Sequence, residues 1–256
     1  MSSVRALVGL VFLEIYRKKD FYVALILMAV ILVYASQIEV YNFENIVRYV
    51  REIGLMLIYL FSIFLAVPLA ARQLAAERDQ RTLAVLLAKP VTRGQFIVGK
   101  SLGAFLASLS AFLIFYSVFI LVTLAKGKMG SPVNLIQAGY LFSLSLLVVT
   151  AMASALSYFL TSPAAMTLAF VFYFLMSLFG ARFDRFAEES VGLARPLGKA
   201  VYYLLPHFEF FDLRQRVIHD WDPVSWGLIA IITAYAVLYT ALFLFSGWLK
   251  FRRQPL

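Results

Sequence analysis

The sequence predicts an all-α protein that crosses a membrane several times, and three observations support this fold class. Hydrophobic residues make up 62% of the 256 residues and charged residues only 14%, whereas soluble domains carry about 25% charged residues. The mean hydropathy is +0.86. The apolar residues also occur in long runs, with the charged residues gathered between them. At this length, roughly six spans of about 20 residues leave little else, so we expect residues 1–256 to form a single transmembrane domain.

The first 20 residues predict a helix that lies in the membrane surface. Apolar residues are mixed there with Arg5, Glu14 and Arg17, a pattern typical of an interfacial helix before the chain enters the bilayer. We therefore expect an elbow helix over residues 1–20. A signal peptide is the alternative, because a basic region precedes an apolar one, but no clear small-residue cleavage site follows the run 21–36.

Six apolar runs are long enough to cross a bilayer core of about 30 Å at about 1.5 Å per residue. The break at residues 161–163 is so short that the fourth and fifth runs are expected to form a tight hairpin. The six predicted spans are residues 21–38, 53–71, 101–125, 135–160, 164–181 and 225–249.

The basic residues predict the orientation of these spans. Cytoplasmic loops are enriched in Lys and Arg, and with both termini inside, the inner segments hold 13 such residues in 56 positions, against 10 in 66 for the outer segments. The net charge of +9 therefore reflects membrane topology, and we do not expect nucleic acid as a partner. The inner segments are 1–20, 72–100 and 250–256, and the outer ones are 39–52, 126–134 and 182–224.

Residues 72–100 form a charged segment between two of the most apolar runs. A short apolar cluster at 83–87 follows four charged residues, and Pro90 stops any helix that begins near Glu77. We expect a short amphipathic helix at the cytoplasmic surface, after which residues 92–94 turn the chain into the third span.

The same segment contains a match to the phosphate-binding pattern GxxxxGK[ST] at residues 94–101. That loop needs small residues between a strand and a helix of a nucleotide-binding domain. Here Phe96, Ile97 and Val98 fill the loop, and no strand pattern precedes it. We therefore interpret the match as chance and expect no ATPase activity in this chain.

The long outer segment 182–224 is rich in aromatic residues and is broken by Pro196 and Pro206. We expect short helices that dip into the outer leaflet, because 197–211 is too short and too charged to cross. The histidines His207 and His219 fit no strong metal-ligand spacing and are interpreted as surface polar residues.

Two further patterns bear on function. Small residues recur every four positions from Gly99 to Ala111, which favours close helix packing either within the chain or across a dimer. The six predicted spans contain no Asp, Glu, Lys, Arg or His, although ion-coupled carriers and intramembrane proteases normally place such groups at membrane depth. The absence of cysteine excludes thiol catalysis. We expect no catalytic, metal-binding or cofactor-binding residue, and energy supplied from outside the bilayer.

From Glu77 to Lys100 the chain resembles the permease subunits of ABC-2 type ABC transporters. These commonly carry a Glu, a Gly-Thr-Leu, a Leu-Leu pair, a Pro-Val/Ile-x-Arg and a Gly-Lys at the mouth of the third span. Arg81 stands where the family usually has glycine, so the turn before Thr82 is expected to differ. The matching residues are Glu77, Thr82, Leu83, Leu86, Leu87, Pro90, Val91, Arg93, Gly99 and Lys100.

The C-terminal half, with the run 202–211 and a closing basic pair, looks like the branch of stand-alone permeases that includes the NosY type. The resemblance implies a multi-pass permease of a bacterial or archaeal inner membrane, surrounded by membrane lipids. It implies a homodimer, or a pair of half-permeases, bound to two separate ATPase chains that hold the ATP and magnesium. The expected function is export of a hydrophobic or amphipathic substrate.

The resemblance also assigns roles to residues. It implies that 72–100 is an ATPase-coupling loop and that the outer segment is an extracytoplasmic gate. The coupling residues are then Glu77, Arg78, Asp79, Arg81, Thr82, Leu83, Leu86, Leu87, Pro90 and Arg93. The gate residues are Tyr202, Tyr203, Pro206, Phe208, Phe210 and Phe211. The alternative function is a membrane anchor or scaffold for an ATPase complex, without transport of its own.

Overall fold

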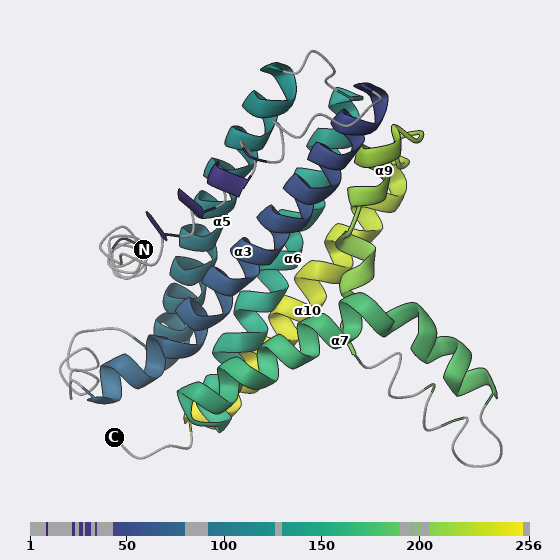
Figure 1. Ribbon diagram of the computed structural model, residues 1–256. Coiled ribbons are helices and arrows are strands. Elements are labelled where there is room, and N and C mark those ends of the chain that lie inside the picture. Colours follow the sequence, from purple (N-terminus) through teal and green to yellow (C-terminus); the bar gives the residue numbers. More distant parts are fainter. Residues whose placement is uncertain are drawn as a thin grey trace.

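The computed structural model describes residues 43–79, 92–125, 130–189 and 205–252, together with a few scattered positions elsewhere. Every regular element in these ranges is a helix. Five are long and two are short, and Figure 1 shows the long ones packed side by side as a bundle. The long helices are α3 (Phe43–Asp79), α5 (Arg93–Ala125), α6 (Pro132–Phe159), α7 (Ser162–Glu189) and α10 (Trp226–Arg252). The short ones are the 3-10 turn η1 (Phe208–Phe211) and α9 (Arg214–His219).

The five long helices confirm five of the six predicted spans, because each is long and apolar enough to cross a membrane. The first predicted span, 21–38, and the elbow helix, 1–20, lie largely outside the described residues, so both stay predictions. We call the end of the bundle that carries α9 and the starts of α3 and α6 the outer end, and the opposite end the inner end (Figure 1).

One predicted span boundary was wrong: the third span was expected to begin at residue 101, but α5 and its candidate span begin at Arg93. The candidate spans of α3 and α7 end at Arg72 and Gly180, which confirms the expected ends at 71 and 181 to within a residue. The helices themselves continue beyond these spans, to Asp79 and Glu189. An apolar run predicts the part of a helix that lies in the membrane. The helix itself can extend further, because charged residues also form backbone hydrogen bonds.

The start of α5 has a specific local cause. The hydroxyl of Thr92 accepts a hydrogen bond from the backbone N–H of Gln95 (3.2 Å), and the side-chain oxygen of Gln95 accepts one from the N–H of Thr92 (3.0 Å). This reciprocal pair is a capping box, which satisfies two N–H groups that have no intrahelical partner. Residues 92–94 therefore begin a helix instead of forming the predicted turn.

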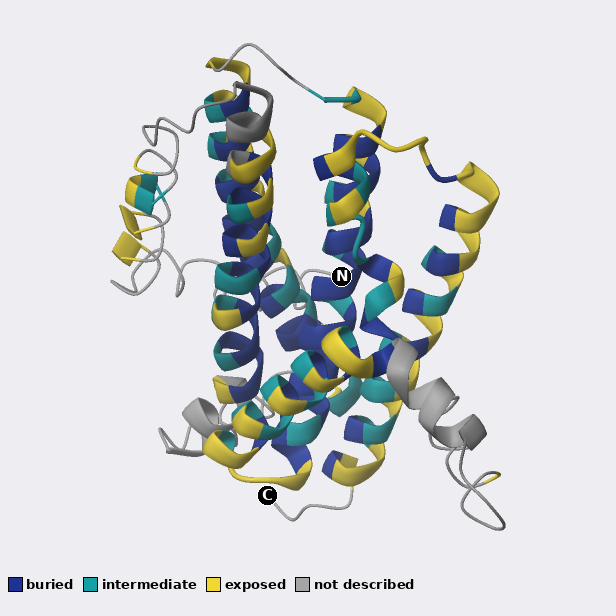
Figure 2. Ribbon diagram, turned by 45° about the vertical axis from the view of Figure 1, so that its right-hand side comes forward, coloured by how far each residue is buried: buried dark blue, intermediate teal, exposed yellow. Residues whose placement is uncertain are grey.

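Helix α6 lies at the centre of the bundle. In the most apolar stretch of α6, 72% of the residues are buried by the rest of the chain, compared with 22% in the corresponding stretch of α10. Figure 2 shows buried residues on the facing sides of the helices and exposed residues on the outward sides. The small residues from Gly99 to Ala111 are buried within α5, so this stripe serves packing inside the chain. The predicted tight hairpin is confirmed, since only Leu160 and Thr161 separate α6 from α7.

Candidate functional site

The predicted coupling residues fall into three groups in the structure. Glu77, Arg78 and Asp79 are the last residues of α3, which extends beyond its candidate span, so the chain is already helical where the coupling helix was expected to begin. Arg93 is the first residue of α5. Residues 80–91, which contain the other six predicted coupling residues, lie outside the described residues.

Arg93 joins the start of α5 to the end of α10. Its Nη1 donates hydrogen bonds to the backbone oxygens of Phe251 (3.0 Å) and Arg252 (2.7 Å). The last carbonyls of a helix have no intrahelical partner and carry partial negative charge, so a cation is well placed there. The guanidinium carbon also lies 5.7 Å from the ring centroid of Phe251. Arg93 therefore caps the C-terminus of α10.

Aromatic side chains strengthen this contact. The ring of Phe251 lies 5.8 Å from that of Phe96 on α5 and 5.4 Å from that of Tyr158 on α6, measured between centroids. Gly247 lets Tyr158 approach α10, since a Cβ at Gly247 would lie 2.9 Å from its ring. We call Arg93, Phe96, Tyr158 and Phe251 the inner clamp. It joins three helices and includes Arg93 and Phe96, which belong to the predicted coupling loop 72–100.

The nucleotide-binding match at 94–101 lies within the first turns of α5, with Phe96, Ile97, Gly99 and Lys100 buried. A phosphate-binding nest needs a loop whose backbone N–H groups point at the ligand. These residues are helical instead. The interpretation of the match as chance is confirmed.

At the outer end, η1 packs into the bundle. Phe208 and Phe211 are buried, whereas Phe210 is 44% exposed. The ring of Phe208 lies 5.1 Å from that of Tyr173 on α7, and those of Phe210 and Phe211 lie 5.8 and 6.3 Å from that of Tyr235 on α10. The expected short helices are present here as η1 and α9. Of the other predicted gate residues, Pro206 is buried, and Tyr202 and Tyr203 lie outside the described residues.

The surface prediction was wrong for His207. This residue is only 4% exposed, and its backbone N–H and Nδ1 lie 2.8 and 3.1 Å from the hydroxyl of Tyr235. A polar side chain can be buried when a neighbour supplies a hydrogen bond, and Tyr235 comes from a distant helix that sequence spacing does not locate. His219 is exposed, as predicted, and stacks on Trp221.

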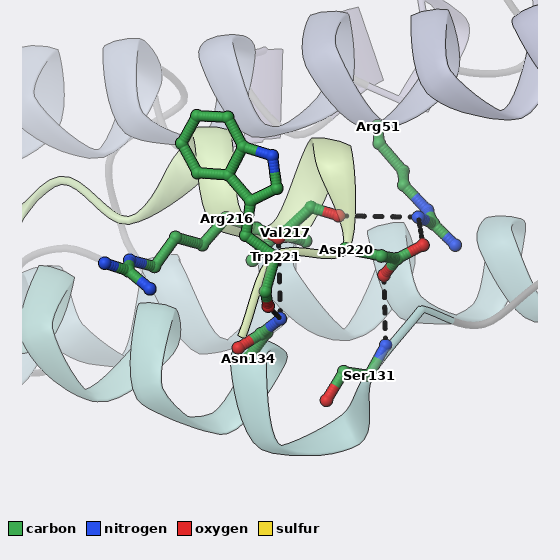
Figure 3. A network of polar contacts seen from close by, with 7 residues as sticks. All are labelled: Arg51, Ser131, Asn134, Arg216, Val217, Asp220 and Trp221. Atoms are coloured by element: carbon green, nitrogen blue, oxygen red, sulfur yellow. Dashed lines mark hydrogen bonds and ion pairs between the residues drawn. The ribbon is translucent and has the colours of Figure 1, made fainter. Parts of the chain in front are cut away.

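A polar network that sequence reasoning missed ties the outer segment to α3 and α6 (Figure 3). Arg51 forms an ion pair of 2.8 Å with Asp220, and its Nη1 lies 3.4 Å from the carbonyl oxygen of Val217. The same carboxylate accepts a hydrogen bond of 3.1 Å from the N–H of Ser131. Asn134 donates to the carbonyl of Trp221 at 2.7 Å. We call Arg51, Ser131, Asn134 and Asp220 the outer clasp.

One more contact extends the outer clasp towards α10. The side-chain amide of Gln137 donates to the carbonyl of Val224 (2.9 Å) and accepts from its N–H (3.0 Å). Both residues are buried, and the amide of Gln137 satisfies the backbone N–H and C=O of Val224, which lies just before α10. The outer segment is thereby hydrogen-bonded to the central helix at two successive turns.

Gly130 tests the outer clasp. A Cβ there would lie 2.3 Å from Asp220 Oδ1 and 3.0 Å from Arg51 Nη1, so Gly130→Ala must displace the carboxylate. We expect amides 214–221 to exchange with deuterium on the order of ten-fold faster, as loss of a charge-assisted hydrogen bond would produce. Gly227→Ala is the matched control, because nothing lies within 4 Å of its Cβ. Equal exchange in both variants would show that the clasp does not hold this segment.

Comparison with known proteins places the chain in a family. No curated protein matches the sequence. A sequence model described as ABC-2 family transporter protein matches residues 6–256, which is nearly the whole chain. Members of this family work with ATPase subunits. This multi-pass membrane protein therefore belongs to the ABC-2 family of ABC transporter proteins, as a permease subunit that has no ATPase domain of its own.

Proposed function

We propose that the chain forms half of an ATP-driven export path, paired with a second permease and bound to two separate ATPase chains. The proposal places both termini and residues 72–100 on the cytoplasmic side and assigns the chain to the NosY-type branch. In this proposal the loop 72–100 receives the movement of the ATPases, and the outer segment, including η1 and α9, opens and closes the outer end. The transported substrate is hydrophobic or amphipathic, in keeping with spans that carry few charges.

The observation that carries the proposal is the position of α10. Its C-terminal end is held by Arg93, a residue of the predicted coupling loop 72–100. Its middle contacts the outer segment, because Tyr235 bonds to His207 and the hydroxyl of Tyr239 lies 3.4 Å from the carbonyl oxygen of Leu205. Phe251 lies 16 positions after Tyr235, which corresponds to about 24 Å of helix. A packed helix moves as a unit over such a length, so α10 gives a direct mechanical route between the two ends.

Replacement of the central part of the predicted coupling loop 72–100 tests which partner the chain binds. Residues 80–91 are exchanged for a flexible Gly/Ser linker of equal length, which spares the end of α3 and the capping box at Thr92. We expect the tagged wild-type chain to co-purify with a Walker-motif ATPase and the linker variant to lose it, because the docking helix is gone. A Gly/Ser linker at 126–129, in the predicted outer loop, is the control and should keep the ATPase.

If the ATPase still co-purifies with the chain after residues 80–91 are replaced, the coupling role of this loop is contradicted. A chain that co-purifies with an ATPase whose hydrolysis never responds to membrane substrates would instead favour the scaffold function. The two outcomes are separate, since the first concerns where the ATPase binds and the second what its hydrolysis drives.

A further inference from the structure

A short-range ion pair lies between η1 and α9. Arg214 donates from Nε and Nη2 to the carboxylate of Asp212, with an Nη2–Oδ2 distance of 2.6 Å. The backbone N–H of Arg214 donates to the same carboxylate at 3.0 Å. The two side chains are 29% and 27% exposed. The pair is therefore neither fully buried nor on the open surface.

Helix α3 locates this pair relative to the membrane. The guanidinium carbon of Arg214 lies 5.2 Å from the ring centroid of Tyr59. Tyr59 is eight residues after Arg51, where the candidate span of α3 begins. At about 1.5 Å per residue, Tyr59 lies about 12 Å inside the outer end of that span. Arg214 is thus a charged residue at the depth of the outer leaflet, where ionisable side chains are costly and usually functional.

The pair adds little to the attachment of the outer segment. It joins residues only two positions apart, whereas Phe208, Phe211 and the outer clasp already fix the segment to the bundle. A buried ion pair often contributes less stability than apolar side chains of equal volume, because both charges lose hydration. Stability alone therefore does not explain an arginine at this position.

The guanidinium keeps free donors for a ligand. Asp212 occupies Nε and Nη2, and among the described residues Nη1 has no hydrogen-bond acceptor. A guanidinium presents five N–H donors in one plane and matches the oxygens of phosphate and carboxylate groups. A guanidinium is not deprotonated in proteins, so Arg214 is a permanent cation.

We propose that Arg214 binds the oxyanion, phosphate or carboxylate, of an amphiphile in the outer leaflet. Asp212 holds the guanidinium beside the ring of Tyr59 and occupies Nε and Nη2, which leaves Nη1 for the ligand. The amphiphile is either the transported molecule or a resident anionic lipid. The assignment to the outer leaflet and the first of these two sources rest on the proposed function, whereas binding of the oxyanion itself does not.

The test uses the purified full-length chain in detergent. It is titrated with phosphatidylglycerol and with phosphatidylcholine of identical acyl chains, and bound lipid is counted by native mass spectrometry. We expect the wild-type chain to prefer phosphatidylglycerol. The double variant Asp212→Asn with Arg214→Gln should reduce that preference on the order of ten-fold, as loss of a charge-assisted hydrogen bond predicts. It keeps the net charge of the chain and leaves no unpaired Asp212.

Arg216→Gln is the matched control. Arg216 lies two residues further along α9, and its Nη1 donates to the carbonyl of Asp222. This variant loses a positive charge, so general electrostatic attraction would weaken more in it than in the neutral double variant. If Arg214 is the binding site, the double variant should instead lose more of the preference for phosphatidylglycerol than Arg216→Gln does. Asp212→Asn alone should bind phosphatidylglycerol several-fold more tightly, because Nε and Nη2 then lose a competing carboxylate.

Three results would overturn the proposal: no preference in the wild-type chain, full preference in the double variant, or equal loss in Arg216→Gln. If the double variant does not melt as the wild type does, Arg214→Lys replaces it and should bind with intermediate preference. The two sources are separated in vesicles that hold the chain with its ATPase. If phosphatidylglycerol labelled on its acyl chain moves across the bilayer when ATP is added, the site belongs to the transport path. If the lipid binds but does not move, it is a resident lipid, and this result counts only against transport of that lipid.

Discussion

Replacing Arg93 with glutamine is expected to abolish most of the ATP-driven movement that we propose for the outer segment. Glutamine loses the two hydrogen bonds of 3.0 and 2.7 Å that the Nη1 atom makes to the last carbonyls of α10. Hydrogen bonds from a charged group contribute about 1.5–3 kcal/mol each. The last turn of α10 should fray, so that movement of the coupling loop no longer reaches this helix.

Engineered cysteines make this measurable, because the chain has no cysteine of its own. Gln215→Cys places an exposed thiol on α9, and its maleimide labelling rate is compared with and without ATP and vanadate in the complex with the ATPase. We expect the nucleotide-dependent change in rate to fall on the order of ten-fold in the Arg93→Gln background, as loss of about 1.5 kcal/mol of coupling would produce. Amides 248–252 should also exchange faster with deuterium.

Arg252→Gln is the control for Arg93→Gln. Arg252 accepts the Arg93 hydrogen bond through its backbone oxygen, which the substitution leaves in place, while the side-chain charge is lost as it is at Arg93. The control should keep the nucleotide-dependent change. If Arg93→Gln keeps the nucleotide-dependent change in labelling rate, the movement must reach the outer end through another helix. Helix α5 is the nearest candidate, because Arg93 of the inner clamp is its first residue.

The fold was largely predictable because a segment that crosses a membrane must be a long apolar run, so hydropathy alone locates the spans in the sequence. Five spans and the α6–α7 hairpin follow from the lengths of the apolar runs and a break around Ser162. The helix ends were not predictable in this way. The start of α5 depends on the capping box of Thr92 and Gln95, two polar residues that hydropathy counts against a helix. The first span, the elbow helix and the coupling helix stay predictions.

The contacts of the candidate site were less predictable than its residues. Arg93, Phe208 and Phe211 were named from the resemblance, and the structure gives each a specific neighbour on another helix. Neither His207 with Tyr235 nor Arg51 with Asp220 could be found from sequence, since the second pair is separated by 169 positions. One usable signal existed for Arg51, because it lies at the outer edge of a span, where an arginine must find a partner or water.

Neutralising Asp220 is expected to release the outer segment more than neutralising its partner does. Asp220→Asn takes the carboxylate from Arg51, a side chain only 7% exposed, whereas Arg51→Met leaves Asp220, which is 48% exposed and can be hydrated. A buried charge that loses its partner costs more than an exposed one. We expect Asp220→Asn to lower the free energy of local opening by roughly 1–3 kcal/mol, a value discounted for the exposure of the carboxylate.

Asparagine isolates the charge because the backbone at this position is unusual. Asp220 has a φ of 50°, in the left-handed region, which asparagine adopts nearly as readily as aspartate does. Alanine there would add backbone strain to the loss of the ion pair. Asp222→Asn is the control, because Asp222 is exposed and, within the described part of the chain, its hydrogen bond to Arg216 is made by its backbone oxygen, which the substitution keeps.

Hydrogen exchange of amides 214–221 measures the opening, and a double-mutant cycle isolates the pair. If the ion pair carries the effect, Arg51→Met with Asp220→Asn should be less destabilised than the sum of the two single variants, since the second substitution removes the charge that the first leaves without its partner. Additive effects would mean that the two side chains act through separate contacts, with Asp220 holding Ser131 and Arg51 holding the carbonyl of Val217. The sign of the coupling energy therefore decides whether the outer clasp is one interaction that opens as a unit or two that open independently.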